Sequence, residues 1–101
     1  MKRIINGKLY DTDTATIIGQ DSFGYTNDFN HWKETLYVKK TGEYFLLGEG
    51  GANSLYREAI NFRTWTSGRK IIPFSLSQAK EWAEAHMSAN DYINAFGEVD
   101  E

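Results

Sequence analysis

The stretch WKETLYVKKTGEYFLL, residues 32–47, decides the fold. In its first half, Leu36 and Val38 fall on one face and Thr35, Tyr37 and Lys39 on the other, at the two-residue period of a strand. Lys40-Thr41-Gly42 follows as a short connection with a glycine, which is typical of a β-hairpin. We therefore predict antiparallel strands over Trp32–Lys39 and Glu43–Leu47. Because residues 44–47 are apolar on both faces, the second strand is expected in the middle of a sheet.

Further strands are predicted on both sides of this hairpin. Asn6-Gly7 tolerates the positive φ angles of a type I′ turn, so Arg3–Ile5 should pair with Lys8–Tyr10. Ala15–Ile18 is expected to form a third short strand. Lys70–Phe74 should form the last one, because its proline suits the edge or the end of a strand.

The remaining residues before position 75 are expected to form loops. Residues 19–30 are rich in Gly, Asp, Asn and Ser, which favours a long surface loop. The glycines of residues 48–51 are expected to end the central strand. For residues 52–68 two interpretations remain open, a short helix over Ser54–Phe62 or an irregular segment. The aromatic and aliphatic residues expected to anchor these loops are Phe23, Tyr25, Phe29, Leu55, Tyr56 and Trp65.

Two short helices are predicted at the C-terminal end. Ser75 and Gln78 have the spacing of a capping box, and Ser88 with Asp91 repeats the signal before a second helix. Gly97 suits the left-handed position that follows a helix. The apolar face of the first helix should contain Leu76, Ala79, Ala83 and Met87, with Trp82 at its border. The second should use Ala89, Tyr92, Ile93 and Phe96.

Length and composition favour one folded domain of the α+β class. The chain has 101 residues, with 41% hydrophobic, 15% aromatic and 25% charged residues and no cysteine, as expected for a reducing compartment. We predict a twisted antiparallel β-sheet of about four to five hairpin-connected strands with a C-terminal pair of short helices. Residues 1–74 should be mainly β with long loops, residues 75–97 helical, and residues 98–101 a frayed acidic tail. No stretch has the length of a signal peptide or a membrane span, so a cytoplasmic location is expected.

No pattern in the chain is typical of catalysis, metal binding or cofactor binding. The glycines of residues 48–51 lack the Lys-Ser/Thr pair of a phosphate loop. His31 and His86, the two histidines, have no metal-ligand spacing, and His86 is expected as a surface or capping residue. The neighbouring carboxylates Asp11 and Asp13 are expected to hold a turn. We therefore predict no catalytic residue, no metal and no cofactor, and a protein that is not an enzyme.

Charge is distributed unevenly and indicates a protein-binding surface. Residues 75–101 carry one Lys against six Asp and Glu, a net charge of −5, whereas residues 1–74 carry ten basic against eight acidic residues, a net charge of +2. Carboxylates on rigid helices can steer a protein toward a basic partner. The candidate partner-binding residues are Glu81, Glu84, Asp91, Glu98, Asp100 and Glu101.

An alternative is a nucleic-acid face on the sheet, because aromatic and basic residues together can bind single strands. Its candidate residues are Trp32, Lys33, Tyr37, Lys39, Lys40 and Arg69. The overall charge of −3 makes this the less favoured interpretation. A homodimer is a further alternative, because exposed strand edges can pair between two copies of the chain.

Residues 2–15, KRIINGKLYDTDTA, resemble the opening of a family of small proteins from Gram-positive bacteria and their mobile elements. The likeness continues in ETLY (34–37), GEYFL (42–46), GEGGA (48–52), KIIP (70–73) and AKEWA (79–83). Some members of this family look like accessory genes of phages and conjugative elements, from which small anti-CRISPR proteins also come. The resemblance implies a non-enzymatic inhibitor that binds a protein partner, specifically an RNA-guided nuclease. It transfers no functional position to this chain.

Overall fold

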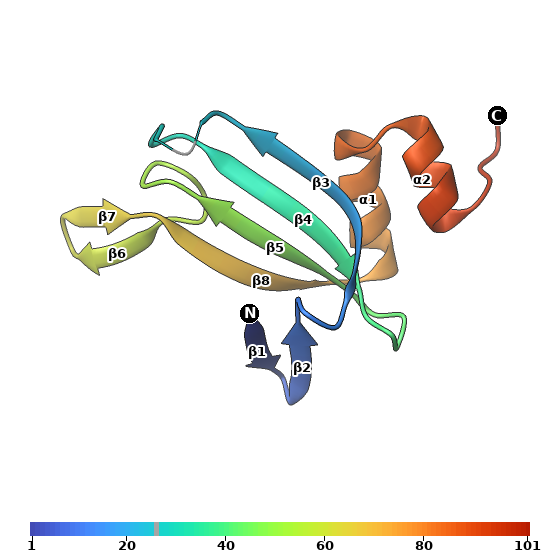
Figure 1. The fold of residues 1–101 in the computed structure, drawn as a ribbon, viewed down its shortest axis with the longest axis horizontal. Helices are drawn as coiled ribbons and strands as arrows, with labels where there is room; N and C mark the ends of the chain where they lie inside the picture. Colours follow the sequence, from blue (N-terminus) through green and yellow to red (C-terminus); the bar gives the residue numbers. More distant parts are fainter. Residues whose placement is uncertain (26) are drawn as a thin grey trace.

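A computed structural model describes residues 1–25 and 27–101 of the chain. Its centre is a four-stranded antiparallel sheet in the order β3-β4-β5-β8 (Figure 1). The strands are β3 (Thr16–Phe23), β4 (Trp32–Val38), β5 (Tyr44–Gly50) and β8 (Gly68–Phe74). The α+β prediction is thus confirmed, and so is the central place of the strand that contains residues 44–47. Within the described residues, no helix combines the length and the hydrophobicity that a membrane span requires.

Each face of the sheet has its own small core. Residues on alternate positions of β4 and β5 point to opposite faces, and the register pairs Leu36 with Leu46 and Tyr37 with Phe45. Leu36 and Leu46 pack under the helix α1 (Leu76–His86), against Ala79, Trp82 and Ala83. Tyr37 and Phe45 pack on the other face with Tyr10, Leu47 and Ile71. The sheet is therefore the middle layer of the molecule.

The hairpin of β1 (Lys2–Ile5) and β2 (Lys8–Asp11) covers the second face. Asn6 and Gly7 have φ angles of 52° and 77°, the left-handed values that the predicted type I′ turn requires. Tyr10 is 5% exposed and contacts Phe45 edge to face at 5.5 Å between ring centroids. Lys8 Nζ lies 2.7 Å from Glu43 Oε2, so an ion pair joins the hairpin to the β4–β5 turn.

The helices α1 and α2 (Ala89–Phe96) begin and end where the caps predict. The Ser75 hydroxyl oxygen accepts a hydrogen bond from the Gln78 backbone N–H, and Gln78 Oε1 accepts one from the Ser75 backbone N–H, which completes the capping box. Gly97 ends α2 with a φ of 93°. The expected apolar face of α1 was partly wrong, because Trp82 lies at the centre of the contact with the sheet while Leu76 is half exposed.

Three predictions about loops were wrong in part. Residues 19–23 belong to β3, because they pair with β4 as far as Trp32. Residue 26 of the predicted loop lies outside the described residues. The glycine run does not end β5, which continues to Gly50 by pairing with β4 and β8. In residues 52–68, neither a helix nor a wholly irregular segment forms. A third hairpin, β6 (Glu58–Asn61) with β7 (Thr64–Thr66), extends beyond the end of the sheet instead (Figure 1).

Candidate functional site

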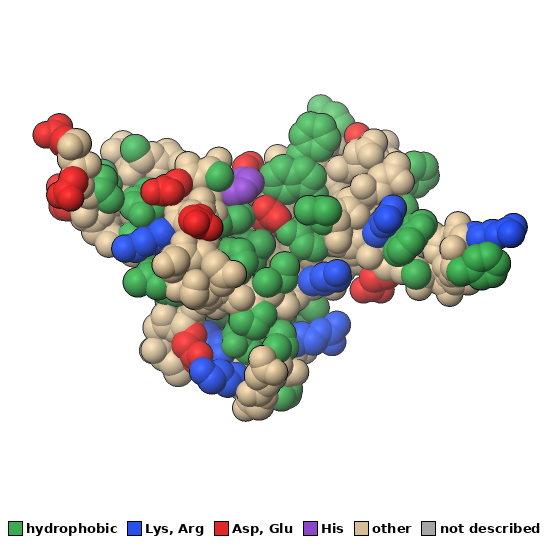
Figure 2. Space-filling view, turned by 180° about the vertical axis from the view of Figure 1, so that it is seen from behind, with side chains coloured by type: hydrophobic (Ala, Val, Ile, Leu, Met, Phe, Trp, Pro, Cys, Tyr) green, Lys and Arg blue, Asp and Glu red, His purple; other side chains and the backbone are tan. Residues whose placement is uncertain are grey.

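The six predicted partner-binding carboxylates lie at one end of the molecule. Glu81 and Glu84 are on α1, Asp91 is in the first turn of α2, and the other three are in the tail after Gly97. All six are exposed, and none of them forms an ion pair in the described part of the chain. Figure 2 shows red side chains gathered over this helical end. We call the six residues the acidic surface.

The alternative nucleic-acid residues do not share one face. Trp32 lies on the helix side of the sheet, where it contacts Phe23 and His86. Tyr37 is buried in the core of the opposite side and cannot stack on a base. Lys39 is held over the Tyr10 ring, 3.6 Å from its centroid, and beside Glu43. Only Lys33, Lys40 and Arg69 remain exposed, so the predicted stacking platform is not assembled from these residues.

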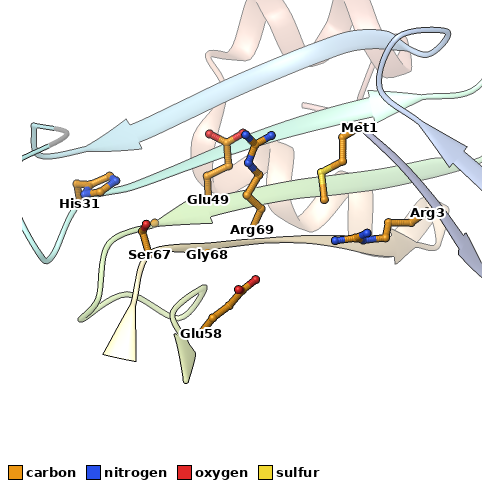
Figure 3. A pocket seen from close by; sticks show the side chains of 9 residues that line it. Met1, Arg3, His31, Glu49, Glu58, Ser67, Gly68 and Arg69 are labelled. Carbon is orange, nitrogen blue, oxygen red and sulfur yellow. The ribbon is translucent and has the colours of Figure 1, made fainter. Parts of the chain in front are cut away.

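An open groove lies on the β1–β2 side of the sheet, between that hairpin and β6. Its volume is about 690 Å³, and its walls bring together residues far apart in the chain, among them Arg3, His31, Glu49, Glu58 and Arg69. Glu49 and Arg69 face each other on β5 and β8 and project together into the groove (Figure 3). The groove therefore presents both signs of charge side by side, which favours no single charged ligand.

A polar cluster that the sequence analysis missed lies between the sheet and α1. Glu34 of β4 accepts a hydrogen bond from Trp82 Nε1 at 3.0 Å and another from the Tyr56 hydroxyl. His86 donates from Nδ1 to Asp21 Oδ2 at 2.8 Å, and its Nε2 lies 3.7 Å from Glu34 Oε1. We call Asp21, Glu34, Tyr56, Trp82 and His86 the polar cluster.

Hydrogen bonding and burial set the ionisation of this cluster. The hydrogen bond from His86 holds the pKa of Asp21 below its ordinary value. Burial, together with the bond to Glu34, raises the pKa of Tyr56 well above its ordinary value. Tyr56 therefore stays a neutral donor and Asp21 an anionic acceptor at neutral pH. His86 thus bridges helix and sheet and is not the surface or capping residue that the sequence predicted.

The polar cluster links α1 to the sheet. Both oxygens of Glu34 are engaged by donors, and the His86 ring stacks on Trp82 at 4.7 Å between centroids. The groove described above is lined by other residues. Within residues 1–25 and 27–101, no group of three or more His, Asp and Glu side chains could hold a metal ion. The cluster fastens α1 to β3 and β4.

The sequence indicates one member of the polar cluster, Glu34, but not the residues that bond to it. Glu34 stands at the same alternate position as Leu36, so it had to point toward a buried face and needed donors. Those donors come from residues 22 and 48 positions later in the chain, which no local pattern specifies.

Comparison with protein-family models, with curated proteins and with solved structures finds no match for this chain. The resemblance carried by residues 2–15 therefore stays a prediction.

Proposed function

We propose that this protein is a non-enzymatic, protein-binding inhibitor or modulator encoded by a phage or another mobile element, and that it blocks an RNA-guided nuclease. The observation that carries the binding proposal is the acidic surface: six exposed carboxylates on two capped helices and their tail, which form no ion pair with any residue that the structure describes. The choice of partner rests on the resemblance of the sequence to small proteins of mobile elements.

The helix α1 holds Glu81 and Glu84 of the acidic surface in a defined place. Both N-termini are capped by serine, and α1 is fixed to the sheet by the hydrogen bonds of Trp82 to Glu34 and of His86 to Asp21. A charged surface on a rigid element loses little conformational entropy on binding. Its uniform sign would speed association with a basic partner.

The fit to an RNA-guided nuclease is electrostatic. Such nucleases hold the guide–target duplex in a positively charged channel. A negatively charged helical end can compete there with the phosphate backbone, because both offer anionic oxygens to the same Lys and Arg side chains.

The test measures cleavage of a target DNA by purified type II effector complexes with increasing amounts of the protein. We expect inhibition that weakens as the salt concentration rises, because exposed charges are screened. The variant E81Q/E84Q should inhibit less, and neutralising Glu98, Asp100 and Glu101 as well should reduce inhibition further.

The matched control is D13N/E58Q, which also removes two exposed carboxylates but outside the acidic surface. It should inhibit like the wild-type protein. Unchanged cleavage at a large excess of protein over several effectors would overturn the choice of partner. Equal effects of the two double variants would overturn the choice of surface.

A further inference from the structure

We propose that the β6–β7 hairpin is a binding site for single-stranded nucleic acid. The site consists of Arg57, Phe62, Arg63 and Trp65, which we call the hairpin surface, with Arg69 at its base. It lies at the other end of the molecule from the acidic surface (Figure 1). The proposal is independent of the proposed function, and it shares only Arg69 with the six sheet residues that failed to form one face.

The first support is the exposure of apolar residues on a projecting element. Phe62 is 87% exposed and Trp65 is 43% exposed, and Leu55 and Ile60, which are near them in the sequence, are exposed as well. Large side chains left in water on a two-stranded hairpin do not stabilise its fold. Exposed aromatic and aliphatic residues grouped in this way are typical of a binding surface.

The second support is the position of the arginines. The guanidinium carbon of Arg57 lies 4.0 Å from the centroid of the Trp65 ring, and that of Arg63 lies 5.0 Å from the centroid of Phe62. A guanidinium held against a ring keeps its N–H groups free for phosphate oxygens. In the described part of the chain neither arginine forms an ion pair with a carboxylate.

The third support is the local charge. Residues 57–70 carry four Arg and Lys against one Glu, a net charge of +3 in a protein whose overall charge is −3. Blue and green side chains occupy this end of the molecule in Figure 2, with little red among them. Charge complementarity thus favours a polyanion as the occupant.

Single-stranded nucleic acid fits this combination better than a protein surface does. Every base offers a flat face to an exposed aromatic ring, and every nucleotide offers a phosphate to a neighbouring cation. Phe62 offers an exposed ring to a base, and Arg63, whose guanidinium carbon lies 5.0 Å from the centroid of that ring, offers a cation to a phosphate. A protein partner would need an apolar pocket with a carboxylate beside it for each arginine, and this arrangement is less common than the base and phosphate that every nucleotide offers.

The experiment is fluorescence anisotropy with labelled oligothymidine of about 12 nucleotides, within the usual site size of small single-strand binders, and with a duplex of the same length. If Arg57, Arg63 and Arg69 contact phosphates, the logarithm of the affinity should fall with that of the salt concentration with a slope of about −2. Affinity then drops about 20-fold between about 50 and 200 mM salt. The single strand should bind more tightly than the duplex.

Two variants test the site. R57Q/R63Q should reduce the slope to about −0.7, because one phosphate contact remains. F62A should weaken binding about tenfold without changing the slope, because it removes stacking and not charge. Phe62 is exposed, so the variant should fold, and circular dichroism checks this. The matched control K2Q/K40Q removes two exposed lysines elsewhere and should leave the slope near −2.

Three outcomes would overturn the proposal. The first is no binding of the single strand at low salt. The second is an equal loss of affinity in K2Q/K40Q and R57Q/R63Q, which would show only a general electrostatic attraction between the protein and the oligonucleotide. The third is a concentration-dependent dimer in sedimentation that F62A abolishes while oligonucleotide binding stays unchanged; that result would assign the hairpin to contact between copies. None of these depends on inhibition of a nuclease, so this proposal and the proposed function can fail separately.

Discussion

The ring of Tyr56 lies directly against the backbone of Gly48, in the space that the Cβ of any other residue would fill. This contact brings the Tyr56 hydroxyl to Glu34, the cross-strand neighbour of Gly48. The side chain of Ser54 occupies the corresponding space over Gly50. Because Gly48 and Gly50 have no side chains, Tyr56 and Ser54 can pack directly on β5, and this packing positions the segment that leads into the β6–β7 hairpin.

Gly48→Ala should destabilise the protein by about 2–4 kcal/mol, because it displaces the Tyr56 ring and breaks the hydrogen bond to Glu34. Urea unfolding followed by tryptophan fluorescence measures the change. The same substitution in a Tyr56→Ala background should cost much less, since the space over Gly48 is then open. A similar cost in both backgrounds would show that strand pairing, and not Tyr56, requires the glycine.

Glu34→Gln should cost about 1–3 kcal/mol of stability. Both oxygens of Glu34 accept hydrogen bonds, from Tyr56 and Trp82, whereas an amide offers one oxygen and turns its NH₂ toward the other donor. Tyr56→Phe removes one of these donors. Because the two residues share a bond, the double variant should lose less than the sum of the single losses, by about 1 kcal/mol. Strict additivity in the unfolding free energies would contradict the bond.

The pair of Asp21 and His86 should make stability fall at acid pH. The hydrogen bond from His86 lowers the pKa of Asp21 from its ordinary value of 3.8. A lowered pKa stabilises the folded state above pH 3.8, and that contribution is lost as the pH falls through the pKa of the folded state. Asp21→Asn should therefore be less stable than the wild type near pH 6 and approach it below pH 3.8. Urea midpoints across this range test the convergence, and a constant difference would argue against it.

Tyr10→Ala should destabilise the protein by about 3–5 kcal/mol, because it empties a site in the second core. Tyr10 is buried against Phe45 and beneath the ammonium group of Lys39. Ile4→Ala on the neighbouring strand is the control, since Ile4 is exposed and its loss should change stability by less than about 0.5 kcal/mol. Equal losses would mean that the β1–β2 hairpin is held by its own pairing rather than by Tyr10.

The predictable parts of this fold are those with local signals. Asn6-Gly7 and Gly42 locate two turns, and the serine caps locate both helices, because each signal acts within a few residues. The central place of β5 followed from its apolar residues on both faces. The sheet and the helices can be predicted from these features. The location of the acidic surface follows as well, because it depends only on where the helices lie.

What could not be predicted depends on contacts between distant residues. Phe23 continues β3 because it pairs with Trp32, and Tyr25 and Phe29 are exposed instead of anchoring a loop. Gly68 begins β8 by pairing with Gly50, which brings β6 and β7 together outside the sheet. The polar cluster and the hairpin surface both arise in this way, so neither could be found from spacing alone.

Removing the two serine caps should have different effects on the stability of the protein. Ser75→Ala should lower global stability by about 0.5–2 kcal/mol, because Ala79, Trp82 and Ala83 tie α1 to the core. Ser88→Ala removes the equivalent bond to the Asp91 backbone, but α2 has no buried residue and can open without unfolding the sheet. Its loss should therefore appear mainly as faster amide exchange within residues 89–96. If Ser88→Ala lowered the global unfolding free energy as much as Ser75→Ala, α2 would be part of the same cooperative unit as α1, and the whole acidic surface would be presented as one rigid body.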